Sequence, residues 1–265
     1  MKKDMKILAI DSSGLVATVA LIEDQNLLAE YTIHHKKTHS QTLMPMLDEI
    51  RQMTELDLDS VDAIAVASGP GSFTGLRIGA ATAKGLAMGL NIPIIEVPTL
   101  EGMAYQMYGA AALVCPIMDA RRNQVYTGLY QFAAEPLCNE NETDREIAEK
   151  EQRTEPKEAG FLLETLWAAN ACDIMECIET INGFEQPVIF LGDGVPVFAE
   201  TIRAHATVPV YFAPAHRRLQ SAASVGALAI EYAKAGRFTE AKDHAPEYLR
   251  VSQAERERME AKKQP

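Results

Sequence analysis

The first third of the chain alternates short apolar runs with turn residues, a pattern typical of strands. Residues 6–10 are apolar and lead into an Asp-Ser-Ser-Gly turn, and two runs rich in apolar and β-branched residues follow at 15–22 and 27–33. Polar residues at 24–26 separate these two runs, as a hairpin turn would. We therefore expect the chain to begin with three strands.

A helical periodicity follows these strands. Apolar residues recur at helical spacing from Leu43 to Met53, after a candidate capping residue at Thr38 or Ser40, and this predicts an amphipathic helix. The elements expected beyond it are a buried strand at 61–67, a helix at about 75–90 and a strand at 92–97. The predicted order of elements in this part of the chain is β-β-β-α-β-α-β.

A second series of elements repeats this order in part. A strand at 113–118 ends at Asp119, and a hairpin strand at 125–132 follows a turn at 121–124. The later elements expected are a helix over about 159–180, a strand at 187–191 that leads into Gly192-Asp193-Gly194, a helix to about 205, a strand at 208–212 and a final helix at about 220–235. We infer an α/β fold of two halves related by duplication, the second one reduced. The expected division is 1–110, 111–252 and a charged tail at 253–265.

The composition is that of a folded, acidic chain. Of the 265 residues, 47% are hydrophobic and 23% are charged, which supplies enough apolar surface to exclude a disordered protein. The 37 acidic and 25 basic residues give a net charge of −12. Because this charge repels phosphate backbones, we do not expect the chain to hold nucleic acid by itself.

Cysteine usage and apolar runs favour a cytoplasmic protein. Four cysteines in a chain of this length do not make a disulfide framework. Cys172 and Cys177 have no second ligand pair near them, so burial in a helix is expected rather than zinc binding. The apolar run at 7–10 stops at Asp11, and no stretch of about 20 apolar residues occurs. We expect no membrane contact.

Two further patterns favour a structural over a functional interpretation. The segment 135–158 is strongly charged with almost no aliphatic residues, which favours a solvated loop or exposed helix over a binding tail. His35 and His39 are four residues apart, the spacing of two ligands on one helix face. However, Lys36 and Lys37 lie between them and no acidic residue is adjacent, so a metal site is not expected there.

Polar turns at the ends of two predicted strands form a candidate phosphate site. The Asp11-Ser12-Ser13 turn follows the first strand, and Asp119 ends the corresponding strand of the second half. Two such turns facing each other across a cleft suit a metal-bound phosphate, and glycine turns let backbone N–H groups approach an anion. The plainer interpretation of the first turn is an Asx turn that closes the hairpin, and the residues leave both open. The candidate residues are Asp11, Ser12, Ser13, Asp119, Gly192, Asp193 and Gly194.

A glycine-rich loop at 68–75 precedes the second predicted helix. It lacks the Gly-Lys-Ser/Thr end of a Walker loop and the Rossmann spacing, and the chain has no Gly-x-Ser-x-Gly hydrolase motif. Small residues recur every four positions in the helix itself, at Gly75, Gly79, Ala83 and Ala87. Such a bare face permits close packing of another helix, either within the same fold or on a partner.

Several longer segments resemble one known family. They are IDSS at 10–13, THSQTLMPML at 38–47, the stretch 67–104 and PEYLR at 246–250. Together they are similar to the bacterial TsaB (YeaZ) family, whose members take part in forming threonylcarbamoyladenosine in tRNA. The resemblance implies the fold of the actin, Hsp70 and sugar-kinase superfamily (ASKHA), with two RNase H-like halves, which agrees with the predicted order of elements.

The resemblance also implies that the chain is not an enzyme on its own. In the catalytic paralogue TsaD, two metal-binding histidines occupy the positions that hold Thr99 and Met103 in this chain. A threonine hydroxyl and a thioether are not an ordinary ligand pair for a hard metal. An accessory subunit with no metal and no catalytic residue is therefore expected, and the same two residues argue against the peptidase activity that an old name of the paralogue suggests.

The partners that the resemblance implies are TsaD, which this chain would bind and stabilise, and the ATPase TsaE. No cofactor is required by the chain itself, ATP would act at the level of the complex, and tRNA would be contacted only through it. The helices at 40–53 and 75–90 are the expected docking surface, for TsaD or for a second copy in a homodimer. The expected interface residues are Leu43, Leu47, Gly75, Arg77, Gly79, Ala83 and Ala87. The alternative function is a small ATPase or phosphotransferase of the same superfamily, motivated by Asp11 and Asp119.

Overall fold

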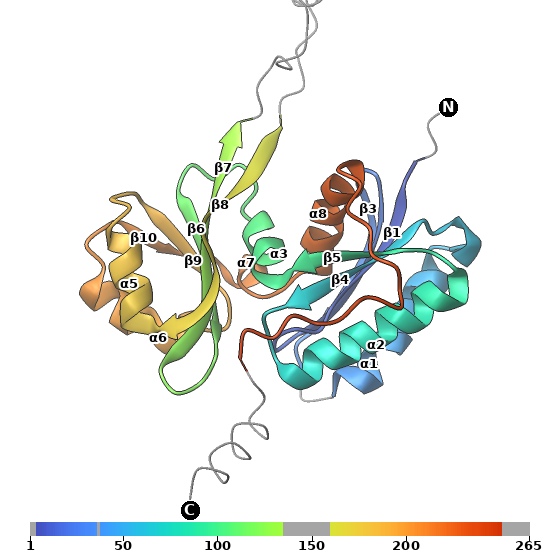
Figure 1. Cartoon of the computed structure of the whole chain (residues 1–265), viewed down its shortest axis with the longest axis horizontal. Coiled ribbons are helices and arrows are strands. Elements are labelled where there is room, and N and C mark those ends of the chain that lie inside the picture. The colour runs from blue at the N-terminus through green and yellow to red at the C-terminus, as the bar shows by residue number, and fades with distance from the viewer. Residues whose placement is uncertain (1–3, 36–37, 135–159, 251–265) are drawn as a thin grey trace, which may run out of the picture.

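The computed structural model describes residues 4–35, 38–134 and 160–250, whose strands form two five-stranded sheets. The first sheet has the order β3-β2-β1-β4-β5, and the second has the equivalent order β8-β7-β6-β9-β10. In each sheet the first three strands along the chain pair antiparallel, and the other two pair in parallel. Figure 1 shows the two sheets side by side. The predicted fold of two duplicated RNase H-like halves is confirmed.

Helices cover both faces of the first sheet. Its strands are β1 (Lys6–Asp11), β2 (Ala17–Glu23), β3 (Asn26–Ile33), β4 (Ala63–Gly69) and β5 (Ile94–Pro98). Helices α1 (His39–Met53) and α2 (Phe73–Leu90) lie on one face, and α8 (Ala222–Lys234) lies on the other. Leu8 and Ile10 pack towards α1 and α2, whereas Ile7 and Ala9 pack towards α8. Because both faces are buried, the central strands are apolar throughout.

The second sheet is also covered on both faces. Its strands are β6 (Leu113–Asp119), β7 (Gln124–Ala134), β8 (Phe161–Asp173), β9 (Val188–Leu191) and β10 (Val210–Phe212). Helices α5 (Ile174–Asn182) and α6 (Val195–His205) pack on one face, with Ile117 and Phe190 in the shared core. The short helix α3 (Thr99–Tyr105) packs on the other.

The expectation of one helix over 159–180 is wrong. Residues Phe161–Asp173 form β8, which pairs antiparallel with β7 along almost its whole length, and only Ile174–Asn182 are helical. Leucine and alanine in this segment favour a helix by propensity, but the backbone of β7 offers a full row of hydrogen-bond partners. Tertiary pairing overrides propensity here, and β8 completes the second three-stranded meander.

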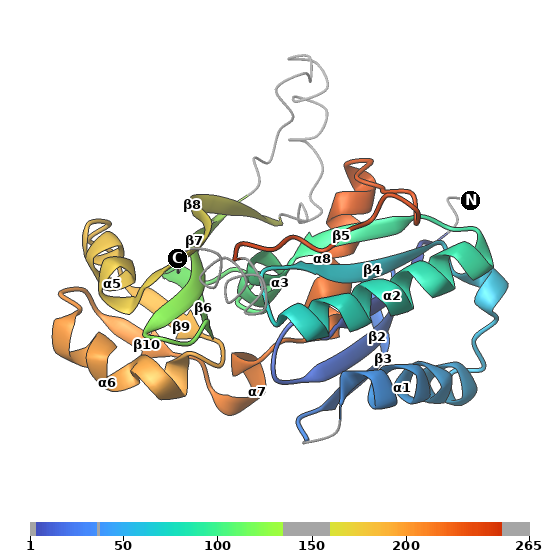
Figure 2. The ribbon, with the colours of Figure 1, turned by 60° about the horizontal axis from the view of Figure 1, so that its bottom comes forward.

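The C-terminal part of the chain returns to the first half. Helix α8 packs on β1, β2 and β5, and Thr239 then exchanges two backbone hydrogen bonds with Ile94 at the edge of β5. The segment 243–250 continues along α2 towards the junction of the two halves (Figure 2). Residues 222–250 therefore cover one face and one edge of the first sheet.

Three further expectations concern the charged segments, the cysteines and membrane-spanning helices. The charged segment 135–158 and the tail 253–265 lie outside the described residues. Cys115, Cys172 and Cys177 are free and buried, although Cys172 lies at the end of β8 and not in a helix. None of the helices in the described ranges combines the length and apolar character that crossing a bilayer requires.

Candidate functional site

Asp11 lies at the end of β1 and is almost completely buried. Its Oδ1 accepts a hydrogen bond from the Ser13 backbone N–H at 2.7 Å, which is the Asx turn expected of a hairpin. Burial raises the pKa of Asp11 to about 6, and hydrogen bonding from Ser13 opposes that rise. Burial in the first turn of the candidate site therefore disfavours the ionised form of the Asp11 carboxyl group.

Asp119 is the structural equivalent of Asp11 in the second half. Its Oδ1 accepts the Arg121 backbone N–H at 2.8 Å, so both hairpins begin with the same Asx turn. The Asp119 N–H donates to Asp193 Oδ1 at 3.0 Å. Burial is the main cause that raises the pKa of Asp193, and the nearby Asp119 carboxylate raises it further. Asp119 and Asp193 thus form one acidic cluster.

The glycines of the second candidate turn serve internal packing. A Cβ at Gly192 would overlap the Ile117 carbonyl oxygen, and one at Gly194 would lie 3.0 Å from the same atom. The Gly192 N–H donates to Arg218 O at 2.7 Å, and the Gly194 N–H donates to Ile117 O at 3.0 Å. These N–H groups already have acceptors, so they are not free to bind a phosphate.

The Ser12-Ser13 turn packs against the loop that precedes α2. Ser12 Oγ donates to the Gly75 carbonyl oxygen at 2.9 Å, and the Ser72 N–H donates to the Ser13 carbonyl oxygen at 2.7 Å. A Cβ at Gly71 would overlap that same Ser13 oxygen. The glycine-rich loop is therefore explained by close contact with the first hairpin.

Gln220 is a candidate residue that the sequence analysis missed. Its side chain is buried beside Gly14, and neither Oε1 nor Nε2 has a hydrogen-bond partner among the described residues. Leaving a buried amide unpaired is costly. A glutamine just before a helix carries no sequence signal, because the feature that matters is its contact with a hairpin some 200 residues earlier.

The two turns offer only part of what a nucleotide phosphate needs. Three carboxylates, on Asp11, Asp119 and Asp193, would repel phosphate unless a divalent cation bound with it. The unpaired Gln220 amide fits a polar ligand, whereas the glycine N–H groups are engaged. Among the described residues, no hydrogen bond or ion pair joins Asp11, Ser12 and Ser13 to the cluster of Asp119 and Asp193. Within the described ranges, no group of three or more His, Cys, Asp or Glu residues is arranged to hold a metal ion.

The interface residues expected on α1 and α2 need correction. Six of the seven, Leu43, Leu47, Gly75, Gly79, Ala83 and Ala87, are buried within the monomer. The bare face of α2 packs on its own fold, because a Cβ at Gly79 would lie 2.6 Å from Ser12 Oγ. Only Arg77 is exposed, and its guanidinium lies 3.9 Å from the centre of the Phe73 ring.

The exposed side of the helix pair carries different residues. Met44 of α1 is 50% exposed and Met88 of α2 is 65% exposed. A Cβ at Gly85 or Gly89 would meet nothing within 4 Å. We call Met44, Ala81, Gly85, Met88 and Gly89 the outer face of α1 and α2. These five residues are apolar and accessible, and those on α2 other than Met88 have small side chains.

Thr99 and Met103 lie one turn apart on α3, and both are fully buried. Met103 packs in an apolar cluster with Leu100, Val114 and Tyr130. The Thr99 hydroxyl has no hydrogen-bond partner among the described residues. A packed thioether and a lone hydroxyl do not fit the ligand set of a hard metal ion. His39 is no ligand candidate either, since its Nε2 lies 3.0 Å from Gly14 O and His35 is exposed.

The segment 247–250 joins the two halves at the candidate site. The Glu247 N–H donates to Ser68 O at 2.7 Å, and Arg250 Nη1 donates to Ala120 O at 2.6 Å. The Tyr248 ring lies 4.8 Å from the Phe73 ring, and its hydroxyl accepts from Arg77 Nε at 3.2 Å. We call residues 247–250 the strap. Its contacts span the loop before α2 and the turn after β6.

Sheet order, paired Asx turns and the two covered sheets define a protein of the actin, Hsp70 and sugar-kinase superfamily. The model of the family described as "TsaD: tRNA N6-adenosine threonylcarbamoyltransferase" matches residues 26–258. A Bacillus subtilis protein named tRNA threonylcarbamoyladenosine biosynthesis protein TsaB is 32% identical over 262 residues, 98% of this chain and 100% of the relative. The chain belongs to this family and, within it, to the TsaB (YeaZ) proteins.

Further comparisons agree with this assignment. The Escherichia coli protein of the same name is 37% identical over 142 residues, 53% of this chain and 61% of the relative. A crystal structure of an uncharacterized Pseudomonas aeruginosa protein with similarity to peptidase YEAZ superposes with a TM-score of 0.70 at 25% identity, covering 93% of this chain and all of that one. YeaZ from the same organism gives 0.65 at 26% identity, covering 92% and 100%.

Proposed function

We propose that this chain is the accessory subunit of TsaD in the formation of N6-threonylcarbamoyladenosine in tRNA, with the ATPase TsaE as the third component. TsaD catalyses the transfer of the threonylcarbamoyl group from threonylcarbamoyl adenylate to N6 of the adenosine. This chain binds and stabilises TsaD and performs no transfer alone. The Bacillus subtilis relative, which matches over its full length, is named for the same pathway.

The observation that carries this proposal is the pair Thr99 and Met103 on α3. The resemblance assigns these positions to metal-binding histidines in TsaD. Here they hold a buried hydroxyl and a thioether packed against Leu100 and Tyr130. The chain has kept the two-sheet fold with an apolar core at the position where the paralogue holds its metal, which favours a supporting over a catalytic role.

The outer face of α1 and α2 is the surface on which TsaD docks in this proposal. Burying Met44 and Met88 against a partner removes apolar surface from water, and Gly85 and Gly89 allow a partner helix to approach closely. A second copy occupies the same face when TsaD is absent. The net charge of −12 fits a subunit that leaves the tRNA to the other components.

Co-purification with TsaD tests the proposal. Gly85→Arg places a long charged side chain on the outer face, in open space, and should abolish capture of TsaD without unfolding the chain. The matched control is Val197→Arg on α6, where Val197 is 56% exposed in the other half, and it should bind TsaD as the wild type does. Normal capture by folded Gly85→Arg would contradict the docking surface.

Reconstituted transfer tests the role itself. The chain alone should transfer no threonylcarbamoyl to tRNA, and addition of the chain to TsaD and TsaE should restore transfer. Robust transfer by the purified chain alone would overturn the accessory role. Because this assay uses no interface variant, it separates the role from the location of the docking surface.

The second candidate function is a small ATPase or phosphotransferase. It is favoured by the equivalent Asp11 and Asp119 turns and by the unpaired amide of Gln220 at the first turn. Calorimetry with ATP and Mg²⁺ tests it. The variant is Gln220→Leu, which replaces the amide by an apolar side chain of similar size. Absence of binding at millimolar nucleotide would end this candidate.

A further inference from the structure

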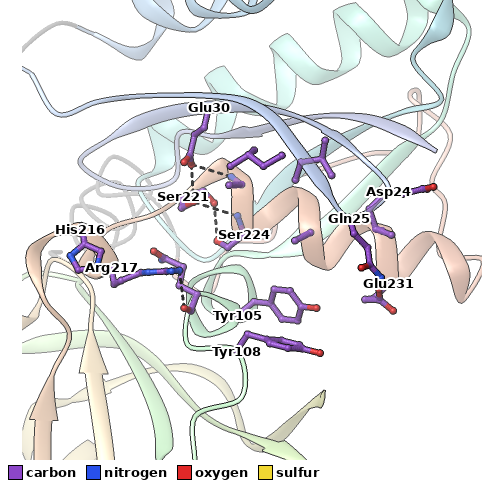
Figure 3. A pocket seen from close by; sticks show the side chains of 16 residues that line it. Asp24, Gln25, Glu30, Tyr105, Tyr108, His216, Arg217, Ser221, Ser224 and Glu231 are labelled. Atoms are coloured by element: carbon purple, nitrogen blue, oxygen red, sulfur yellow. Dashed lines mark hydrogen bonds between the residues drawn. The ribbon is translucent and has the colours of Figure 1, made fainter. Parts of the chain in front are cut away.

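A groove of about 780 Å³ lies on the α8 side of the junction between the two halves (Figure 3). Its walls come from four segments, namely the β2–β3 hairpin, the end of α3 with the residues after it, the short helix α7 (Ala215–Arg218) and α8. It shares no residue with the Asp11 and Asp119 turns or with the outer face of α1 and α2. Its size is that of a site for a small organic ligand.

The middle of the groove is a slot between α8 and two aromatic rings. Ala223 and Ala227 of α8 line one wall. Tyr105 and Tyr108 line the opposite wall in an edge-to-face pair, with ring centres 5.4 Å apart (Figure 3), so one of the two rings is available to stack on a planar ligand. Alanine side chains leave space beside the helix, and aromatic side chains stack planar rings. This part of the groove suits a heterocycle.

One end of the groove is cationic. His216 and Arg217 of α7 project there (Figure 3). Arg217 Nη1 donates to Gln106 O at 3.2 Å, and Gln106 Nε2 in turn donates to Leu219 O at 2.9 Å. This hydrogen bond fixes the guanidinium through one N–H, and within the described ranges its other N–H groups have no hydrogen-bond partner. A guanidinium held in this way binds a phosphate well.

The N-terminus of α8 does not add to this cationic end. The Glu30 carboxylate already accepts the Ser221 hydroxyl at 2.7 Å and the Ala223 N–H at 3.1 Å. The Glu30 carboxylate thus occupies the N-terminus of α8. His216 and Arg217 remain as the groups that select an anionic ligand.

The far end of the groove presents hydrogen-bond acceptors. Asp24, Gln25 and Glu231 lie there (Figure 3). Asp24 Oδ1 accepts the Met5 N–H, and Glu231 Oε1 pairs with the Lys234 ammonium group. The second oxygen of each carboxylate is left to accept from a ligand. These oxygens accept from ring or amino N–H groups, and they keep a phosphate out of this end of the groove.

We propose that this groove binds one nucleoside monophosphate, with the phosphate at His216 and Arg217, the base in the slot and its N–H groups towards Glu231. The nucleotide is either free or the 5′-phosphorylated end of an RNA. This inference does not rest on the proposed accessory role, since it concerns a different surface.

Calorimetry on the full chain tests this site with AMP, adenosine and inorganic phosphate as probes. AMP should bind at least about tenfold more tightly than either fragment, because only AMP fills both slot and cationic end. Arg217→Ala should weaken AMP binding at least about tenfold, and Ala227→Leu should abolish it by filling the slot. The matched control is Arg203→Ala on α6, an arginine outside the groove that stacks on Phe212.

Two further measurements complete the test. A 5′-phosphorylated trinucleotide and its unphosphorylated counterpart distinguish an RNA end from a free nucleotide, and binding of either phosphorylated probe supports the site. Amide chemical shifts should change at Ala223 and Ala227. Failure of every phosphorylated probe at millimolar concentration would overturn the proposal. Equal binding of phosphate alone, shifts confined to Gly192–Gly194, or unchanged binding by folded Arg217→Ala and Ala227→Leu would do the same.

Discussion

Ser12 and Gly75 contact each other at two points, although 63 residues separate them. The Ser12 hydroxyl donates to the Gly75 carbonyl oxygen at 2.9 Å. A Cβ at residue 75 would also overlap the Ser12 carbonyl oxygen. Because the second contact meets a backbone oxygen of Ser12, the overlap cannot be relieved by rotating a side chain of the hairpin. The first turn of α2 is therefore fitted to the hairpin after β1.

Gly75→Ala should destabilise the protein by about 3 kcal/mol, because the added methyl group forces α2 away from the hairpin. Gly85 lies on the same helix in open space, so Gly85→Ala should stabilise it by about 0.5–1 kcal/mol through helix propensity. Urea unfolding of both variants measures the difference. Equal effects at the two positions would contradict the close approach of Ser12.

Asp11 should make stability depend on pH. Its pKa rises on folding from 3.8 to about 6, so between these values the folded state holds more protons than the unfolded state. Stability should therefore fall as pH rises from about 4 to 6, by about 3 kcal/mol in total, and stay level above that. Asp11→Asn should remove this fall. Unfolding free energies of wild type and variant at pH 4, 5, 6 and 7 give the comparison, and parallel profiles would refute the assignment.

Tyr248 should hold the strap on α2. Tyr248→Ala removes the stacking on Phe73 and the bond from Arg77, with an expected loss of about 1–2 kcal/mol. Hydrogen exchange at the Glu247 amide, which donates to Ser68 O, should accelerate. Tyr211→Ala is the control, because Tyr211 is 57% exposed on β10 and should affect neither quantity. A protected Glu247 amide in Tyr248→Ala would show that the ring does not anchor the strap.

Thr99 should tolerate loss of its hydroxyl. Replacement of a buried, unpaired hydroxyl by a methyl group removes a desolvation penalty, so Thr99→Val should be more stable by about 1 kcal/mol. It should also support TsaD in reconstituted transfer as well as the wild type does. Thermal unfolding and the transfer assay check the two expectations. Loss of transfer in a stable variant would reveal a ligand role for this hydroxyl.

Much of the fold follows from local patterns. Apolar runs ended by turns predict β1 to β5. The signal is strongest in β1, β2 and β4, because strands buried on both faces are apolar at nearly every position. The exception is Phe161–Asp173, whose strand state depends on pairing with β7 rather than on its own composition. No window of sequence contains that partner, so propensity favours a helix there.

The candidate site was harder to predict than the sheets. The Asx turns at Asp11 and Asp119 are local and could be recognised. Gln220 and the strap meet the first half only through contacts across the whole chain, which spacing does not reveal. The small-residue period of α2 was recognised, but a period alone does not say which surface it faces. The close contacts of Gly75 and Gly79 with Ser12 show that this face of α2 packs inward, against the first hairpin.

The position of α8 also bears on how the protein is made. A ribosome that has added residue 110 has synthesised all five strands of the first sheet, but not the helix at 222–234 that covers Ile7 and Ala9. That apolar face of the sheet stays uncovered until residues 222–234 have been synthesised. Contacts between segments this far apart form slowly, and exposed sheet faces aggregate. Maturation of the N-terminal half therefore depends on α8, which is made after both sheets.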